Sequence, residues 1–354
     1  MNSYAELPQA WPKPTHPLPV VCVGAGGIAR AAHLPAYRAL GIPVCGVFDR
    51  DPTAAQSLAK EFEIARVFGS LEEAIAEPGV LFDLAVPPSA SEATLERLPV
   101  GAAVLIQKPM GENLAQARRL LQLCQERKLV AAVNFQLRFS PNMLALAAAI
   151  RAGVLGDVVD VEVRVNTRTP WELWPFLRGI PRHEIVYHSI HYLDLIRAFL
   201  GEPRGVYAKA VRHPALPDYA DTRSAIILDY GDWVRATVSA YHSHDYGLRH
   251  AASEIKVEGT RGCAVARIGV NLSYPDGLPD TLEIAQAGSQ FEPVALRGAW
   301  FPEAFEGTMS NLQRFATGED QELVTNVGDA FKTMALTEAC YQSSAAGGVP
   351  IPSA

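Results

Sequence analysis

The segment Val20-Val21-Cys22-Val23-Gly24-Ala25-Gly26-Gly27-Ile28-Ala29 decides the fold, because a short apolar run passes directly into a glycine-rich turn. The apolar run predicts a buried strand, and the residues from Ile28 to Leu40 predict the helix that follows. The turn has the spacing G-x-G-x-x-A, which binds the pyrophosphate of a dinucleotide when it lies between a strand and a helix, whereas an isolated match is also typical of a plain glycine turn. The first glycine permits the tight turn, the second lets phosphate approach the backbone, and the helix N-terminus supplies amides and a positive dipole. We therefore expect four residues to contact the dinucleotide: Gly24, Gly26, Gly27 and Ile28.

The next predicted strand, Val44–Phe48, ends in Asp49, twenty residues after Ala29. A carboxylate at this place binds the ribose hydroxyls, which favours NAD as the cofactor. Arg50 follows directly and could stack on adenine or meet a 2′-phosphate, so NADP stays open as the alternative. Asp49 could also be a turn residue that caps the next helix.

From residue 18 to residue 138, short apolar runs alternate with amphipathic stretches, as in the βαβ units of a parallel sheet. This rhythm predicts a doubly wound Rossmann domain. Strands are expected at Val20–Val23, Val44–Phe48, Leu81–Val86, Ala103–Ile106 and Val130–Val133. Helices are expected at Ile28–Leu40, Thr53–Glu61, Leu71–Ala76, Ser91–Leu98 and Asn113–Arg127.

Residues 139–354 predict a differently built α+β domain with a large, mostly antiparallel open sheet. The last helices are expected to be able to pack back on the Rossmann domain. Strands are expected at Val158–Asn166, Val206–Val211, Ala225–Tyr230, Val234–Tyr241 and Glu254–Glu258. Helices are expected at Met143–Ala152, Glu184–Leu200, Phe305–Ala316 and Val327–Ser343.

The composition excludes several classes of partner. The chain has 354 residues and a formal net charge of −7, with 49% hydrophobic and 19% charged residues and no basic cluster. Such a charge repels a phosphate backbone, so nucleic acid is not an expected partner. No apolar run is long enough to cross a membrane, and the Pro-rich arm at residues 1–17 lacks the order of a secretory signal, which predicts a cytoplasmic protein.

Four further motifs, in order along the chain, resemble the Gfo/Idh/MocA family of sugar and inositol dehydrogenases. They are Asp83-Leu84-Ala85-Val86-Pro87-Pro88, Gln107-Lys108-Pro109, His191-Tyr192-Leu193-Asp194, and Thr337-Glu338-Ala339-Cys340-Tyr341-Gln342-Ser343. The resemblance covers nearly the whole chain and implies hydride transfer between NAD(P) and a sugar-like substrate. It also implies that Val86, Pro87, Pro88, Gln107 and Lys108 line the cofactor.

The resemblance assigns proton transfer to two side chains. Oxidation of a carbinol needs a base for the hydroxyl proton while the hydride leaves for the nicotinamide. Lys108 is the first candidate, because partial desolvation beside the positive ring lowers the pKa of an amine, and the Lys108–Pro109 bond is a candidate for the cis form. His191 would hydrogen-bond the reacting hydroxyl and shuttle its proton. The alternatives are a surface lysine and a satisfied core histidine.

The sequence departs from the family pattern around these residues. Tyr187 replaces the usual aspartate four residues before the histidine, Ser189 replaces a glycine, and Gln107 stands where the family usually has glutamate. Tyr187 could act as a hydroxyl donor or acceptor and His188 could share proton transfer, or Tyr187 could be an aromatic that packs at the domain interface.

Substrate binding is expected from two segments and from the histidines. The segment Asn134–Arg138 follows the last Rossmann strand, and the loop Thr169–Arg178 carries two tryptophans and an arginine. These side chains can stack on a sugar ring and bind its hydroxyls, or the loop could be an ordinary packed loop or a subunit contact. The expected substrate residues are Gln136, Arg138, Trp174, Arg178, His188 and His191.

Glu184, His188 and His191 also have the spacing of a two-histidine, one-carboxylate metal site. No metal is predicted, because the family resemblance implies none and the H-E-x-x-H pattern is missing.

The main hypothesis is therefore an NAD(P)-dependent dehydrogenase of a sugar, inositol or sugar derivative. A second hypothesis is a redox-neutral glycoside lyase or hydrolase that uses tightly bound NAD transiently, and a third is a non-catalytic dinucleotide sensor. The open sheet of the second domain predicts a homodimer or homotetramer, since pairing would bury apolar surface.

Overall fold

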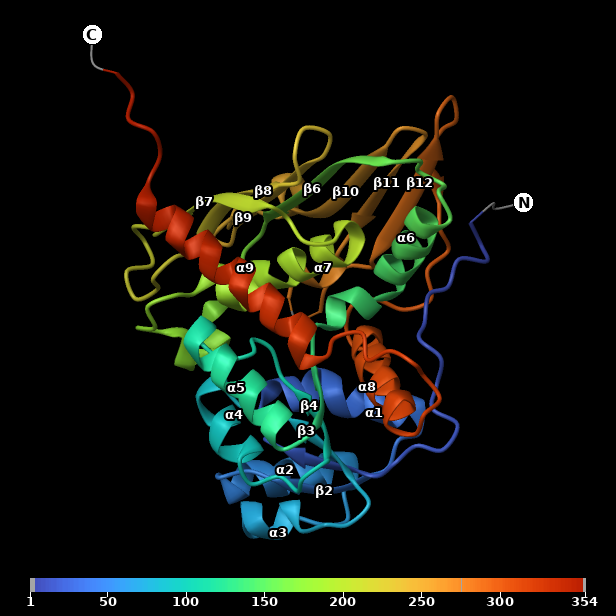
Figure 1. The fold of residues 1–354 in the computed structure, drawn as a ribbon, viewed down its shortest axis with the longest axis vertical. Coiled ribbons are helices and arrows are strands. Elements are labelled where there is room, and N and C mark those ends of the chain that lie inside the picture. The colour runs from blue at the N-terminus through green and yellow to red at the C-terminus, as the bar shows by residue number, and fades with distance from the viewer. Residues whose placement is uncertain (1–3, 275, 353–354) are drawn as a thin grey trace. The chain divides into compact units, whose positions relative to one another are not determined.

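The computed structural model describes residues 4–274 and 276–352 (Figure 1). It contains two compact units. The first unit consists of Pro8–Leu144 and Arg297–Met334, and the second has Ala145–Leu296 as its main part together with the C-terminal segment from Ala335. Both units match the predicted fold class: the first is built on a parallel sheet and the second on a mostly antiparallel one.

The first unit contains a five-stranded sheet in which every pairing is parallel. Four of its strands have the bounds that the sequence predicts. The third ends earlier than predicted, at Leu84, because the chain turns at Ala85 and soon reaches Pro87, which has no N–H to continue a ladder. In sheet order the strands are β2 (Val44–Phe48), β1 (Val20–Val23), β3 (Leu81–Leu84), β4 (Ala103–Ile106) and β5 (Val130–Val133).

Helices connect these strands, and side-chain caps set where several of them begin. The side chains of Asp51, Ser70 and Asn113 each accept a backbone N–H at the start of a helix. After β1 a π-helical turn, Ala29–His33, leads into α1 (Leu34–Leu40). The other crossover helices are α2 (Pro52–Phe62), α3 (Leu71–Ile75), α4 (Pro88–Leu95) and α5 (Leu114–Glu126).

A late segment of the chain completes the core of the first unit. Helix α8 (Glu303–Ala316) packs against β4, β5 and α1. Phe305 and Met309 lie in the same buried cluster as Leu81, Leu105 and Ala132 of the sheet. Removing this apolar surface from water stabilises the sheet. Elsewhere in the same unit, α4 and α5 run next to each other (Figure 1).

The second unit contains an eight-stranded sheet in which all pairings are antiparallel except β6 with β9. The five predicted strands are present: β6 has its predicted bounds, and the ends of the other four are shifted by one or two residues. Three more, β11 to β13, were not predicted. The strands are β13 (Glu292–Pro293), β12 (Thr281–Gln286), β11 (Gly262–Arg267), β10 (Ala252–Gly259), β6 (Val158–Asn166), β9 (Arg235–Tyr241), β8 (Arg223–Asp229) and β7 (Gly205–Val211).

Residues alternate between buried and exposed along β8, so only one face of this end of the sheet is covered. Helix α7 (Ile190–Leu200) packs against β9 and follows a π-helical segment, Ile185–Ser189. The remaining helices are α6 (Pro141–Arg151) and α9 (Val327–Ala346).

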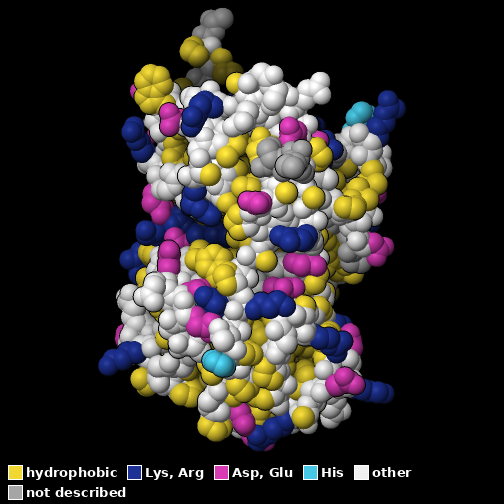
Figure 2. All heavy atoms as spheres, turned by 90° about the vertical axis from the view of Figure 1, so that its right-hand side faces the viewer, with side chains coloured by type: hydrophobic (Ala, Val, Ile, Leu, Met, Phe, Trp, Pro, Cys, Tyr) yellow, Lys and Arg dark blue, Asp and Glu magenta, His cyan; other side chains and the backbone are white. Residues whose placement is uncertain are grey.

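Among the described residues, no helix combines the length and apolar character that crossing a membrane requires. Figure 2 shows acidic and basic side chains interspersed over one face of the molecule, with hydrophobic side chains between them.

Candidate functional site

The glycine loop of the first unit has the shape that a pyrophosphate needs. Gly24 has φ +108°, and a Cβ there would lie 2.5 Å from the carbonyl oxygen of Ala85, so only glycine fits. Gly26 and Gly27 are exposed, and a Cβ at either would meet no heavy atom within 4 Å. The loop is therefore tight where it meets β3 and open where phosphate would lie. These residues fit a dinucleotide.

Asp49 lies directly after β2 and touches the same loop. Its Oδ2 accepts the N–H of Ala25 at 2.7 Å, and its Oδ1 accepts the N–H of Asp51 at 2.8 Å. These bonds hold the carboxylate against the loop, where the ribose of a dinucleotide would reach it. Arg50 is exposed beside it.

Four predicted cofactor positions follow four neighbouring parallel strands. Gly24 follows β1, Asp49 follows β2, Val86 follows β3 and Lys108 follows β4. Because the strands are parallel, these positions all lie at the carboxyl edge of one sheet, where ligands of such sheets bind. Pro87 and Pro88 complete the turn after β3 and begin α4.

A buried polar network lies beneath Gln107 and Lys108. Oδ2 of Asp83 accepts hydrogen bonds from Nδ1 of His33 and from the Tyr37 hydroxyl, both at 2.8 Å. The Nε2 of His33 lies 3.1 Å from the Gln107 amide nitrogen and 3.2 Å from that of Asn134. Because these amide nitrogens can only donate, Nε2 accepts. The side chains of His33 and Asp83 are fully buried.

Lys108 lies next to this network. The Gln107 Oε1 accepts the backbone N–H of Lys108 at 2.8 Å, and the Lys108–Pro109 bond is cis. Desolvation lowers the pKa of the Lys108 amine from its ordinary value to about 8. An amine with this pKa can exchange a proton near neutral pH.

The two predicted substrate residues of the first unit are packed into its structure. Gln136 is buried in a short 3-10 helix, and the Arg138 guanidinium lies 2.7 Å from the carboxylate of Asp329 at the start of α9. The ion pair holds the Arg138 side chain in place. Contact of Gln136 and Arg138 with substrate stays a prediction.

In the second unit, His191 is buried on α7, with 4% of its surface exposed. Asp194, the other polar residue of the H-x-x-D motif, lies 3.8 Å from Arg197, and Arg197 also binds Glu202 through two nitrogens. Asp194 therefore belongs to an ion-pair network at the end of α7.

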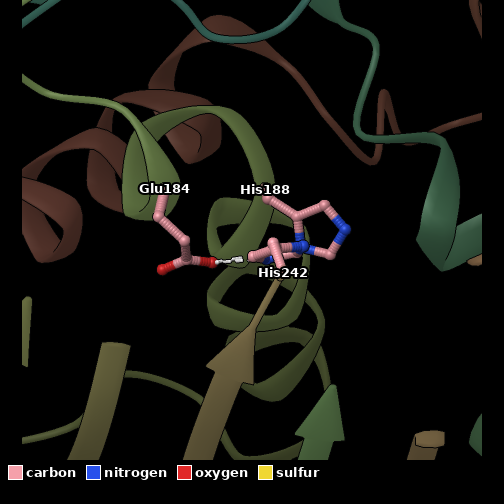
Figure 3. A group of neighbouring side chains, drawn as sticks. All are labelled: Glu184, His188 and His242. Carbon is pink, nitrogen blue, oxygen red and sulfur yellow. Dashed lines mark hydrogen bonds and ion pairs between the residues drawn. The ribbon is translucent and has the colours of Figure 1, made fainter. Parts of the chain in front are cut away.

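Three side chains of the second unit converge around one point (Figure 3). The buried Oε1 of Glu184 accepts the Ser189 hydroxyl at 2.6 Å, and it lies 3.2 Å from Nε2 of His242 and 4.0 Å from Nδ1 of His188. Although burial opposes ionisation, the His242 contact lowers the pKa of Glu184 below its usual value. The sequence pattern joined Glu184 and His188 with His191; in the structure the third member of this group is His242, at the end of β9.

The loop Thr169–Arg178 packs into the second unit through Trp171, one of its two tryptophans. Trp171 is buried against Leu177 and Tyr219, and Tyr187 and Trp174 pack on the same cluster. Arg178 is exposed beside Tyr219, which raises the pKa of its guanidinium. This loop and Tyr187 thus pack within the second unit, and their contacts with substrate stay predictions.

Several residues of these sites carry no signal in the sequence. Asp221 accepts the N–H groups of His183 and Glu184, both at 3.0 Å, and so anchors the start of the π-helical segment. Burial, aided by the charge of Glu184, raises the pKa of Asp221 to about 6, and desolvation lowers the pKa of His183 to about 4. His33 and Asp221 bind partners that are distant in sequence, and His242 follows a strand with no motif around it.

Two family profiles match the chain. Residues 18–135 match the "Oxidoreductase family, NAD-binding Rossmann fold", and residues 143–265 match the "GFO/IDH/MocA C-terminal domain". A D-apiose dehydrogenase of Rhizobium rhizogenes is 25% identical over 87% of this chain and 89% of its own length. An inositol 2-dehydrogenase of Rhizobium meliloti is 26% identical over 84% of this chain and 88% of its own.

Solved structures share the fold. An oxidoreductase from Agrobacterium radiobacter, solved in complex with NAD⁺, L-tartaric acid and magnesium, superposes with a TM-score of 0.76. It has 22% sequence identity and covers 93% of this chain and 97% of its own. Together the two profiles span the glycine loop, Lys108 and His191, and the chain belongs to the Gfo/Idh/MocA family of oxidoreductases, whose N-terminal domain binds NAD.

Proposed function

We propose that this protein is an NAD(P)-dependent dehydrogenase that oxidises a CH–OH group of a sugar, an inositol or a sugar derivative. The observation that carries the proposal is the position of Lys108. Its amine, with a pKa of about 8, follows β4 at the same sheet edge as Gly24 and Asp49. A proton acceptor at the cofactor edge of a Rossmann sheet is what carbinol oxidation requires.

The chain supplies binding and proton transfer, and the cofactor supplies the hydride acceptor. Gly24, Gly26, Gly27 and Ile28 would hold the pyrophosphate, and Asp49 the ribose. Lys108 in its neutral form would take the hydroxyl proton. His191 from the second unit would hydrogen-bond the same hydroxyl, and Tyr187 would assist as a hydroxyl donor or acceptor.

The nature of the relatives supports the substrate class. The relatives named above are dehydrogenases of apiose and of inositol, which are both polyhydroxylated. In this chain Trp174 and Arg178 belong to a loop that can offer an aromatic face and a cation to such a molecule.

NAD is the proposed cofactor in preference to NADP. The Asp49 carboxylate is held against the glycine loop by the Ala25 amide, and its negative charge would repel a 2′-phosphate. Arg50 is exposed at the next position and would attract a 2′-phosphate, so NADP stays the alternative.

One departure from the family pattern favours a second function. Tyr187 stands where an aspartate is usual, and it packs against aromatic side chains. A site without that carboxylate could couple transient oxidation to elimination or hydrolysis of a glycoside, with no net change of the cofactor.

The assembly is proposed to be a homodimer or homotetramer formed through the second sheet. Tyr207, Ile227 and Trp233 are exposed and line a shallow hollow on that sheet together with Val159. Burying such an apolar area against a second copy would be favourable.

The test is a screen of sugars, inositols and sugar acids with NAD⁺ and with NADP⁺, which follows both the reduced cofactor and the products. Net formation of NADH supports the dehydrogenase. Product formed without net reduction supports the redox-neutral enzyme. Saturable NAD⁺ binding without turnover of any compound favours a dinucleotide sensor and contradicts the proposal.

A further inference from the structure

Glu184, His188 and His242 form a compact donor cluster in the second unit, away from the glycine loop in sequence. One potential ligand atom from each lies within 4.8 Å of the others. Glu184 is the N-cap of the π-helical segment Ile185–Ser189 and His188 lies within that segment, whereas His242 follows β9, so two separate elements hold the group. In Figure 3 the Glu184 carboxylate points toward His242, and the ring of His188 lies close to that of His242, with the ring centroids 4.1 Å apart. Short π-helical segments inside helices are frequent at functional sites.

The spacing of these atoms is close to that of ligands on one metal ion. Two ligands at about 2.0–2.1 Å from a tetrahedral zinc ion lie about 3.3–3.4 Å apart. Oε1 of Glu184 and Nε2 of His242 are 3.2 Å apart, and Nδ1 of His188 is 4.0 Å from the same oxygen. A small movement of the His188 side chain, which is 14% exposed, would close the set.

Both buried ligand candidates have partners that would orient them. Nδ1 of His242 lies 2.7 Å from the Thr169 hydroxyl, which leaves Nε2 directed toward Glu184. The Ser189 hydroxyl donates to Oε1 of Glu184 at 2.6 Å. Hydrogen bonds of this kind, from outside the ligand set, fix the tautomer and direction of metal-bound histidines and carboxylates.

We propose that Glu184, His188 and His242 bind one divalent ion of the zinc class. Nitrogen and carboxylate donors suit zinc and its transition-metal neighbours, whereas calcium and magnesium prefer six or more oxygen ligands. The ion would replace the proton shared by His242 and Glu184, and that proton would leave to solvent. The sequence does not indicate this set of three residues, because His242 is 54 residues beyond His188 in the chain, with no motif to join them.

Three protein ligands leave one position open on a tetrahedral ion. An ion of this kind binds and polarises a hydroxyl or carbonyl oxygen, which is the group that a polyol substrate offers. The proposal stands apart from the dehydrogenase function, since binding of the ion by these three residues does not depend on any cofactor or turnover.

The experiment uses the full chain without a histidine tag. Metal content is measured by mass spectrometry after purification without chelators, and Zn²⁺ and Co²⁺ are titrated into protein stripped with a chelator. The expected results are one ion per chain, a higher thermal unfolding midpoint with Zn²⁺, and the visible absorption of Co²⁺ bound to nitrogen and oxygen. Wild-type protein that binds neither ion overturns the proposal, and Glu184–His242 is then a hydrogen-bonded pair only.

Variants locate the ion. Glu184→Gln and His242→Gln keep side-chain volume and should abolish Co²⁺ absorption, and His188→Ala, at the more exposed ligand, gives the same test with less risk to folding. Thr169→Val should weaken Zn²⁺ binding by about 10–100-fold, because it removes only an orienting partner. His250→Ala, an exposed histidine of the same unit, is the control and should bind as wild type does. Equal binding by wild type and all three ligand variants would place the ion elsewhere and contradict the proposal.

Discussion

The side-chain amide of Gln107 joins His33 to the backbone of Lys108. Its nitrogen lies 3.1 Å from Nε2 of His33, and its oxygen accepts the Lys108 N–H at 2.8 Å. The amide nitrogen can only donate, so Nε2 of His33 accepts, and a carboxamide is the group that donates on one side and accepts on the other. The glutamine that replaces the family's usual glutamate is thus the residue type that these two contacts need.

Changing Gln107→Glu should destabilise the protein. A glutamate carboxylate can still accept the Lys108 N–H, but it cannot donate to Nε2 of His33 and so leaves that contact unmade. We expect a loss of about 1–3 kcal/mol in the free energy of unfolding. Chemical denaturation measures this, with exposed Gln125→Glu on α5 as the control. A Gln107→Glu protein that is as stable as the control would contradict the network.

Gly24 and Gly26 should respond differently to alanine. Gly24→Ala places a Cβ 2.5 Å from the Ala85 oxygen at a positive φ, and we expect it to cost about 1–3 kcal/mol of stability. A Cβ at Gly26 would meet no heavy atom within 4 Å, so Gly26→Ala should change the free energy of unfolding by no more than about 0.5 kcal/mol. The same change should weaken NAD⁺ binding. Chemical denaturation and NAD⁺ titration separate the two. Undiminished NAD⁺ affinity in Gly26→Ala would argue against this loop as the phosphate site.

The first sheet was predictable because its strands are short apolar runs between clear turn signals. The bounds of β1, β2, β4 and β5 follow directly from the sequence. Strands β11 to β13 were not predicted, since Gly262–Arg267 is rich in small residues and Glu292–Pro293 is only two residues long. The parallel pairing of β6 with β9 depends on strand order, which local patterns do not encode.

The residues of the candidate sites also divide into those that local sequence patterns predict and those that they do not. Those in local motifs, the glycine loop and Gln107-Lys108-Pro109, were identified from sequence, and the cis form of the Lys108–Pro109 bond is confirmed. His33 was missed and His242 could not be assigned to a site, because each acquires its partners through tertiary contacts across 50 or more residues. The periodic pattern on one helix identified His191 as a candidate. Such a pattern cannot show that His242, which follows a strand, contacts Glu184 on that helix.

Asp49→Asn should weaken NAD⁺ binding by about 10–100-fold. The change removes a charge-assisted acceptor for the ribose and weakens the bond to the Ala25 amide, a loss of about 1.4–2.8 kcal/mol. Affinity for NADP⁺ should fall less or rise, since repulsion of a 2′-phosphate is removed. Titration with both cofactors checks this. Asp51→Asn, which changes only the cap of α2, is the control and should keep wild-type affinity.

Ile227→Glu should lower the oligomeric mass of the protein. Ile227 is 50% exposed on the uncovered face of the second sheet, beside Tyr207, and a buried carboxylate there would oppose pairing of two copies. Light scattering at micromolar concentration measures the mass, and Val100→Glu in the first unit is the control. A monomeric wild-type protein, or an unchanged mass in Ile227→Glu, would contradict assembly through this face.

The pH dependence of substrate oxidation, measured at saturating NAD⁺ for wild type and for Lys108→Met, tests the central claim most directly. The Lys108 amine accepts a proton only when neutral, so the wild-type rate should rise with pH and reach half its maximum near the pKa of about 8. At saturating NAD⁺, Lys108→Met should react about 10²–10⁴-fold more slowly and lose this rise. The control is Lys60→Met, a change at an exposed lysine of α2. A Lys108→Met protein with the wild-type rate and the wild-type pH profile would contradict the proposed role of Lys108.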